Sequence, residues 1–209
     1  MKDDRHIIIN VGRQLGSGGQ DIGRMLAKDF DATYYDKELL SLAAQESGFS
    51  EEFFERNDER KGFLRSFLHH PYGLGSGSAN FYQNNFSQEG LFKFQSDAIR
   101  KAAQKGSCVF LGRCADYVLR DLDNVVNIFI TASIDFRVAN VANKQGISYD
   151  EAKKLIETEE AARAAYYNYY TGKQWGMATS YDLCIDASLL GLQETERIIA
   201  DFVRKRFNL

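Results

Sequence analysis

The sequence predicts an α/β protein built on a parallel sheet. Strand-like apolar runs alternate with helix patterns along the 209 residues, and such alternation is typical of a parallel sheet covered by helices. The apolar runs are short and continuous, as expected for strands buried on both faces. A turn with four glycines in eight residues, Gly12 to Gly19, directly follows the first run. Because the length suits one core, a single domain over residues 1–209 is expected.

The first third of the chain begins with a strand, a turn and a helix. Ile7 to Val11 is a β-branched run that predicts a buried strand, and apolar residues at helical spacing predict a helix from about Gly19. Thr33 to Tyr35 predicts a second short strand. A helix pattern then starts at Lys37, for which Asp36 is a suitable N-cap.

A change of composition marks the middle of the chain. Residues 69–87 contain the only proline, Pro71, together with many Gly, Ser and Asn residues, and this composition predicts a mobile loop. Helical spacing resumes from Glu89 to Lys105, and Gly106 ends it.

The second half repeats the alternation. Ser148-Tyr149-Asp150-Glu151 has the form of a capping box and predicts the start of a long helix. The expected strands are Ser107 to Leu111, Val125 to Thr131 and Leu183 to Ile185, and the expected helices are Cys114 to Arg120, Ile134 to about Lys144, Ser148 toward Tyr170 and Glu194 to Phe207.

Composition narrows the classes of partner. A net charge of −3 gives no overall attraction to nucleic acid or anionic lipid. Three cysteines without a C-x-x-C pair favour buried free thiols in a reducing compartment, and the charged start of the chain has no long apolar run behind it. A cytoplasmic protein without a membrane span is expected. Three histidines, two of them adjacent, do not suggest a structural metal site.

The glycine-rich turn predicts a phosphate site. A strand, a turn of small residues and a helix start present backbone N–H groups and the positive end of the helix dipole to an anion. A tight β–α turn without a ligand is the alternative, and the glycine spacing does not match the G-x-G-x-x-G pattern of dinucleotide sites. The residues expected to hold ATP phosphates are Gly16, Ser17, Gly18, Gly19, Gln20 and Asp21.

This turn departs from the usual P-loop pattern G-x-x-x-x-G-K-[ST]. Aligning Gly16-Ser17-Gly18 with its second half places Gly19 at the lysine position and Gln20 at the hydroxyl position. A substitute cation is therefore needed, with Arg13 and Arg24 as local candidates. Gln20 or Asp21 would assist Mg²⁺, directly or through water.

Five short motifs in order resemble the cytidylate-kinase-like family. The resemblance extends over nearly the whole chain, except about residues 54–88. The motifs are Gly16-Ser17-Gly18-Gly19-Gln20-Asp21-Ile22-Gly23, Tyr35-Asp36-Lys37-Glu38-Leu39-Leu40, Val109-Phe110-Leu111-Gly112-Arg113-Cys114-Ala115-Asp116, Asn127-Ile128-Phe129-Ile130-Thr131-Ala132-Ser133 followed by Arg137, and Tyr181-Asp182-Leu183-Cys184-Ile185-Asp186.

The resemblance implies a three-layer P-loop kinase fold with a parallel five-stranded sheet, an acceptor-binding insertion at about 50–90 and a lid at about 148–180. It also implies transfer of the γ-phosphoryl group of ATP, with Mg²⁺, to CMP or dCMP. Asp36, Arg113 and Asp116 would then bind the acceptor, and a bidentate arginine suits its phosphate. Asp36 as a plain helix cap, and Arg113 paired with Asp36 or Asp116, are the alternatives.

Four cations from different parts of the chain are the remaining candidates. Arg13, Arg137, Arg163 and Lys173 are expected to screen the transferring phosphate, because such catalysis is mostly positioning and electrostatic stabilisation. Each of the last three, taken alone, is equally well explained as a solvated helix-face charge. The tyrosines from Tyr166 to Tyr170 favour a packed stripe over a base-stacking platform, since Tyr166 and Tyr170 share a helical face.

Two other functions remain open from the sequence. One is a nucleotide sensor that keeps the phosphate cradle without turnover, because the P-loop lysine is absent. The other is a P-loop phosphotransferase for a different small acceptor, because the insertion at about 50–90 is unusual. The oligomeric state is not defined by these patterns.

Overall fold

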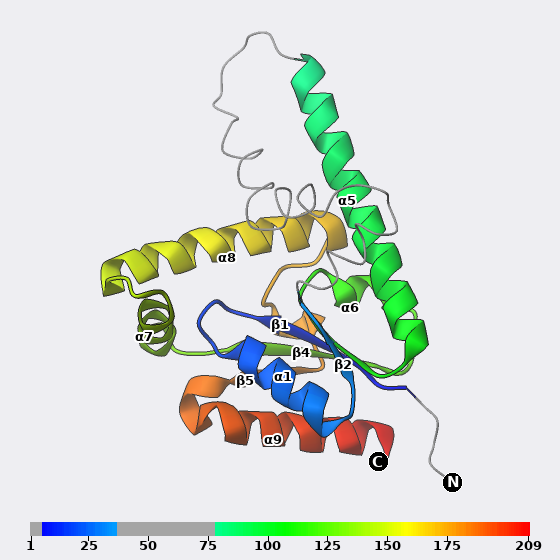
Figure 1. The fold of residues 1–209 in the computed structure, drawn as a ribbon, viewed down its shortest axis with the longest axis vertical. Helices are drawn as coiled ribbons and strands as arrows, with labels where there is room; N and C mark the ends of the chain where they lie inside the picture. The colour runs from blue at the N-terminus through cyan, green and yellow to red at the C-terminus, as the bar shows by residue number, and fades with distance from the viewer. Residues whose placement is uncertain (1–5, 37–77) are drawn as a thin grey trace.

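The computed structural model describes residues 6–36 and 78–209, which form a five-stranded parallel sheet in the order β2-β3-β1-β4-β5. Figure 1 shows the sheet between two layers of helices. The strands are β1 Ile8–Arg13, β2 Thr33–Tyr35, β3 Cys108–Leu111, β4 Val125–Thr131 and β5 Leu183–Asp186. The helices are α1 Gly19–Asp29, α5 Ser78–Lys105, α6 Ala115–Val118, α7 Ile134–Gln145, α8 Tyr149–Thr171, η1 Ala178–Ser180 and α9 Ala187–Phe207.

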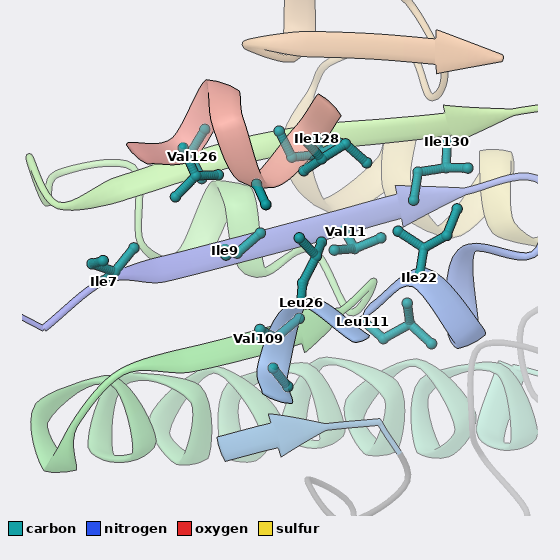
Figure 2. Packing of buried hydrophobic residues seen from close by; sticks show 14 of the residues in the cluster. Ile7, Ile9, Val11, Ile22, Leu26, Val109, Leu111, Val126, Ile128 and Ile130 are labelled. Carbon is teal, nitrogen blue, oxygen red and sulfur yellow. The ribbon is translucent and has the colours of Figure 1, made fainter. Parts of the chain in front are cut away.

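Each face of the sheet carries its own apolar core. Alternate residues of a strand point to opposite faces, so Ile9 and Val11 of β1 pack with α1 and α9, whereas Ile8 packs with α5 and α6. Figure 2 shows Ile9, Val126 and Leu26 within the first of these clusters. Burial of both faces explains why the strands read as continuous apolar runs.

The order of the strands positions the functional edge. β1 lies between β3 and β4, and all strands run in parallel. The chain therefore leaves β1 toward one side of the sheet and reaches β4 on the other side. In open parallel sheets, ligands bind beyond the carboxyl ends of the strands at such a switch point. The turn after β1 lies there.

Several predicted boundaries shift in the structure. β1 continues to Arg13, because pairing with β4 extends through Gly12 and Arg13. The closing helix α9 begins at Ala187 rather than Glu194, with Asp186 as its N-cap, and bends at Gly191, whose φ is 78° and ψ is 170°. The short helix after β3 covers only Ala115–Val118. The predicted capping box at Ser148 is confirmed, and Ser133 is the N-cap of α7.

The loop expected at residues 69–87 is partly wrong. Residues 78–87 belong to α5, which extends the helix predicted from Glu89 by several turns. Helical backbone hydrogen bonding prevailed there over the loop-like composition. The remainder of that loop, the helix expected from Lys37 and most of the insertion at about 50–90 lie outside the described residues.

The structure also places the three cysteines and allows the helices to be compared with a membrane span. Cys108 and Cys114 are buried, but Cys184, which was also expected to be buried, is exposed because β5 is the edge strand. Among the helices described, none is both long and apolar enough to span a membrane.

Candidate active site

The glycine-rich turn wraps the start of α1 in the way a phosphate cradle requires. Gly16 and Gly18 have φ values of 81° and 82°, in the left-handed region where a side chain is strained. Gly18 is the N-cap of α1, and no side chain in the described part of the chain caps it. The first N–H groups of α1 therefore have no side-chain cap, and Gly18, Gly19 and Gln20 line the cleft at this end of the helix.

Tight packing holds the turn in place. A Cβ on Gly16 would lie 2.5 Å from the backbone oxygen of Arg137, and a Cβ on Gly18 would lie 2.2 Å from Cδ2 of Leu192. The amide of Asn140 donates to the carbonyl of Gly16 at 2.9 Å. The hydroxyl of Ser17, which is fully buried, donates to the carbonyl of Gln14 at 2.9 Å. These glycines are thus required by packing as well as by any ligand.

A cleft opens above the turn and is predominantly cationic. Asp21 and Asp36 are the carboxylates among the residues that line it. The lining cations, which outnumber them, are Arg13, Arg113, Lys144 and Arg163. Such a cleft attracts anions, since cations on low-dielectric walls concentrate the field.

Arg113 occupies a strained turn after β3. Gly112, Arg113 and Cys114 have φ values of 75°, 61° and 54°, so two non-glycine residues adopt a conformation that costs each about 1–2 kcal/mol. Arg113 is buried, with 7% of its surface exposed. Strain held at a cleft is the kind of outlier from which a functional role is inferred.

Arg13 lies beside this turn. A Cβ on Gly112 would meet Nη1 of Arg13 at 2.2 Å, so the guanidinium occupies the space that glycine leaves open. Arg163 approaches from α8, and its Nη1 donates to the carbonyl of Arg13 at 3.5 Å. The structure therefore gathers Arg13, Arg113 and Arg163 at one place between the turn after β1 and the turn after β3.

The other two candidate cations lie apart from these three arginines. Arg137 of α7 donates through Nη1 to Glu160 at 2.6 Å and through Nε to the carbonyl of Ala132 at 3.1 Å. Lys173 places its Nζ 4.0 Å from a carboxylate oxygen of Asp116. Arg137 is buried, so it is not a solvated helix-face charge. Lys173 follows the end of α8 and is exposed, so a solvated charge remains an alternative for it.

Asp116 belongs to a narrow buried crevice next to the cleft. Its carboxylate accepts a hydrogen bond from the hydroxyl of Tyr167 at 2.6 Å. Burial raises the pKa of Asp116, against the lowering effects of Tyr167 and Lys173. Burial also raises the pKa of Tyr167, and the charge of Asp116 adds to this. Arg13, Arg113 and Arg163 line both crevice and cleft, so the two spaces adjoin.

The tyrosines of α8 pack as the helical spacing predicts. Tyr166 and Tyr167 are buried, and the ring of Tyr170 stacks on Phe92 with centroids 4.0 Å apart. These contacts join α8 to α5 across the top of the sheet (Figure 1). Tyr169 is the exception and is 63% exposed.

Asp36 and Asp21 both lie in the cleft with partners. Asp36 accepts from the side-chain amide of Gln20 at 3.1 Å, and Asp21 lies 3.0 Å from Nζ of Lys144. Mg²⁺ usually binds through one or two carboxylates together with substrate phosphates and water. The described residues contain no group of three ligands for a protein-only metal site, and a role of Asp21 toward a magnesium ion that arrives with a nucleotide remains a prediction.

Several cleft residues were not found from the sequence. Asn140 and Lys144 lie four residues apart on one face of α7, a spacing that the sequence displays but that does not reveal which element the face meets. Glu160 and Leu192 come from α8 and α9 and contact the glycine-rich turn. Only the packing of α7, α8 and α9 brings these residues to the turn.

The fold and the cleft define a protein of the P-loop kinase class. The chain belongs to the cytidylate kinase-like family, whose model matches residues 8–189. The resemblance read from the short motifs is thereby confirmed.

Relatives with known names support the same assignment. The chain is 28% identical over 187 residues to cytidylate kinase of Pyrococcus abyssi, covering 87% of this chain and 85% of that one. It is 30% identical over 108 residues to cytidylate kinase of Methanopyrus kandleri, covering 48% and 56%. In several of these matches, the chain spans only about half of the relative's length.

Solved structures share the fold. An uncharacterized protein from Eubacterium ventriosum is 27% identical, with a TM-score of 0.72 over 96% of this chain and 99% of that one. Shikimate kinase from Bacteroides thetaiotaomicron is 13% identical, with a TM-score of 0.55 over 98% and 100%. The second likeness concerns the fold alone.

Proposed function

We propose that this protein is a nucleoside monophosphate kinase that transfers the γ-phosphoryl group of ATP to CMP or dCMP. The observation that carries the proposal is the single cleft in which the uncapped start of α1 and the strained, buried Arg113 face the same space. Phosphoryl transfer needs a donor phosphate and an acceptor phosphate side by side. Membership of the cytidylate kinase-like family supports the cytidylate acceptor.

In this proposal, the glycine-rich turn holds the donor. Backbone N–H groups from Gly16 to Asp21 bind the phosphates, and Mg²⁺ arriving with ATP neutralises charge on the phosphate oxygens. Lys144 supplies an ammonium at the start of α1, in place of the lysine that Gly19 replaces. Its Nζ already lies in the cleft, 3.0 Å from Asp21.

Arginines would then bind the acceptor phosphate and stabilise the transferring phosphoryl group. Arg113 grips the acceptor phosphate through its guanidinium fork. A phosphate oxygen of the acceptor attacks the γ-phosphorus, the bond from that phosphorus to the β-phosphate oxygen breaks, and ADP leaves. Arg13 and Arg163 lie between the two sites and stabilise the charge on the equatorial oxygens. Asp116 lies in the adjoining crevice, where its carboxylate accepts hydrogen bonds from the acceptor nucleoside.

Coupled detection of ADP with a panel of acceptors tests the proposal. ADP formation that depends on CMP or dCMP, and is weak with AMP, GMP and UMP, is the expected result. Calorimetry of ATP·Mg²⁺ binding accompanies the assay. ATP binding without turnover on any acceptor would instead favour a nucleotide sensor, which Gly19 at the lysine position also suits. Turnover only with a non-nucleotide acceptor would overturn the choice of substrate, and absent ATP binding would overturn both functions.

A further inference from the structure

A carboxylate from α8 reaches the glycine-rich turn. The backbone N–H of Leu15 donates to Oε1 of Glu160 at 3.0 Å, across 145 positions of the sequence. Leu15 lies within the turn that the sequence predicts to bind phosphate, and it lines the cleft. One amide of the cradle therefore already binds an anionic group.

The same oxygen accepts from a second donor, and this donor is cationic. Nη1 of Arg137 donates to Oε1 of Glu160 at 2.6 Å. Both side chains are largely shielded from water, with 9% of Arg137 and 17% of Glu160 exposed. The second bond of Arg137, from Nε to Ala132, fixes the direction of its guanidinium. Leu15 and Arg137 thus converge on one oxygen position at the mouth of the turn.

A backbone amide and a guanidinium are also the groups that bind phosphate oxygens in proteins. We propose that Leu15 and Arg137 form a phosphate subsite, that Glu160 holds this subsite in the nucleotide-free protein, and that a phosphate of a nucleoside triphosphate displaces it. The inference rests on the proposed function. It assigns Glu160 the role of an internal competitor for the ligand, which is distinct from binding substrate.

The position of Glu160 couples the subsite to α8. Arg163 follows Glu160 after three residues and contacts the carbonyl of Arg13, so the same stretch of α8 makes both contacts with the turn. When a phosphate displaces Glu160, Arg137 exchanges one anion for another and α8 loses its hydrogen bond to Leu15.

Calorimetry with inorganic triphosphate and with ATP·Mg²⁺ tests this competition. Glu160→Gln removes the charge but keeps the shape, so both ligands should bind about tenfold tighter, within the range typical of coupling between sites. Glu160→Asp keeps the charge but shortens its reach and should also bind more tightly than the unmodified protein. Glu157→Gln is the matched control: Glu157 is exposed on the same helix, so affinity should not change.

An affinity of Glu160→Gln that is unchanged or weaker would have a different meaning. If Glu160 serves to orient Arg137 for the ligand, Glu160→Gln would bind triphosphate equally well or more weakly, and the inference would be overturned. Unmodified protein that binds neither ligand would remove the proposed function, and the subsite with it. Binding by unmodified protein without tighter binding by Glu160→Gln would remove the subsite alone. Circular dichroism and thermal unfolding show that each variant is folded before its affinity is compared.

Discussion

At Arg113, the backbone conformation and the side-chain chemistry point to the same role. The left-handed φ of 61° is unfavourable for a residue with a Cβ. Such a strained geometry persists only where the surrounding structure maintains it. It turns a buried guanidinium toward the cleft next to Arg13 and Arg163. Residues held in this way are concentrated at functional sites.

Arg113→Ala should therefore damage activity more than stability. Loss of a buried charge pair with the acceptor phosphate should lower kcat/KM for CMP by an amount equivalent to about 2–4 kcal/mol. Arg113→Lys should recover only part, because an ammonium lacks the bidentate fork. Steady-state kinetics with varied CMP measures the effect, and Arg100→Ala on the exposed face of α5 is the control. Unchanged kinetics would remove Arg113 from the site.

Asp116 gives a pH-dependent prediction. Burial raises the pKa of Asp116 in the folded state above the ordinary value of 3.8. At a pH between the unfolded and the folded pKa, the folded state therefore binds more protons than the unfolded state. Stability from this group is therefore complete below the unfolded pKa and is lost as the pH rises through the folded pKa.

Asp116→Asn should remove this pH dependence. At pH 7, the free energy of unfolding of the variant should equal or exceed that of the unmodified protein, because an amide can still accept from Tyr167. The difference should shrink as the pH falls toward 4. Urea unfolding at several pH values measures it, with the exposed Asp121→Asn as control. A difference that does not vary with pH would contradict the assignment.

At the scale of elements, a few residues at the helix ends determine where α7 stops and α8 starts. Ser148 and Glu151 form the reciprocal capping box that starts α8, and Gly146, with φ of 67°, closes α7. The chain thereby reverses within a few residues. Because α7 and α8 both contact the glycine-rich turn, this reversal decides which side chains reach the cleft.

Two glycines that both have open space around them should change the free energy of unfolding in opposite directions when replaced by alanine. No atom lies within 4 Å of a Cβ at Gly90 in α5 or at Gly146. Gly90→Ala should raise the free energy of unfolding by about 0.5–1 kcal/mol, because alanine favours the helix. Gly146→Ala should lower it by about 1–2 kcal/mol, because alanine is strained at positive φ. Urea unfolding of the pair compares them, and changes of the same sign would contradict the backbone assignment.

At the scale of the whole molecule, the site joins segments from nearly the full length of the chain. β1, β3 and α8 bring Arg13, Arg113 and Arg163 together, and α9 contributes Leu192 under the glycine-rich turn. A ligand that bridges these segments stabilises the folded state as a unit. Binding should consequently be visible in global unfolding.

ATP·Mg²⁺ should raise the melting temperature. At a ligand concentration of about 100 times Kd, the stabilisation is about 2.7 kcal/mol. For a chain of this size, that corresponds to an increase of about 5–10 °C. Differential scanning calorimetry measures the shift, and adenosine, which lacks phosphates, should produce little. An equal effect of adenosine would show that the phosphates are not the main contact.

Local patterns were enough for much of the fold and for part of the site. The run from Ile7 and the glycines that follow it specify strand, turn and helix through neighbouring residues alone, and the motif around Arg113 does the same after β3. The alternation of such units predicted the parallel sheet, which the structure confirms. The roles expected of Gly16 to Asp21, Asp36 and Arg113 remain predictions that the proposed experiments test.

The remaining features were decided by tertiary structure. Composition favoured a loop where the structure has the first turns of α5, since pairing of backbone groups along a helix outweighs weak residue preferences. The pairing of Arg137 with Glu160, the approach of Lys144 to Asp21 and the burial of Asp116 beneath Tyr167 all join residues far apart in the chain. The sequence determined the sheet, its turns and the chemistry available at each position. Only packing determined which charges meet, because the distance between two side chains depends on every element that lies between them.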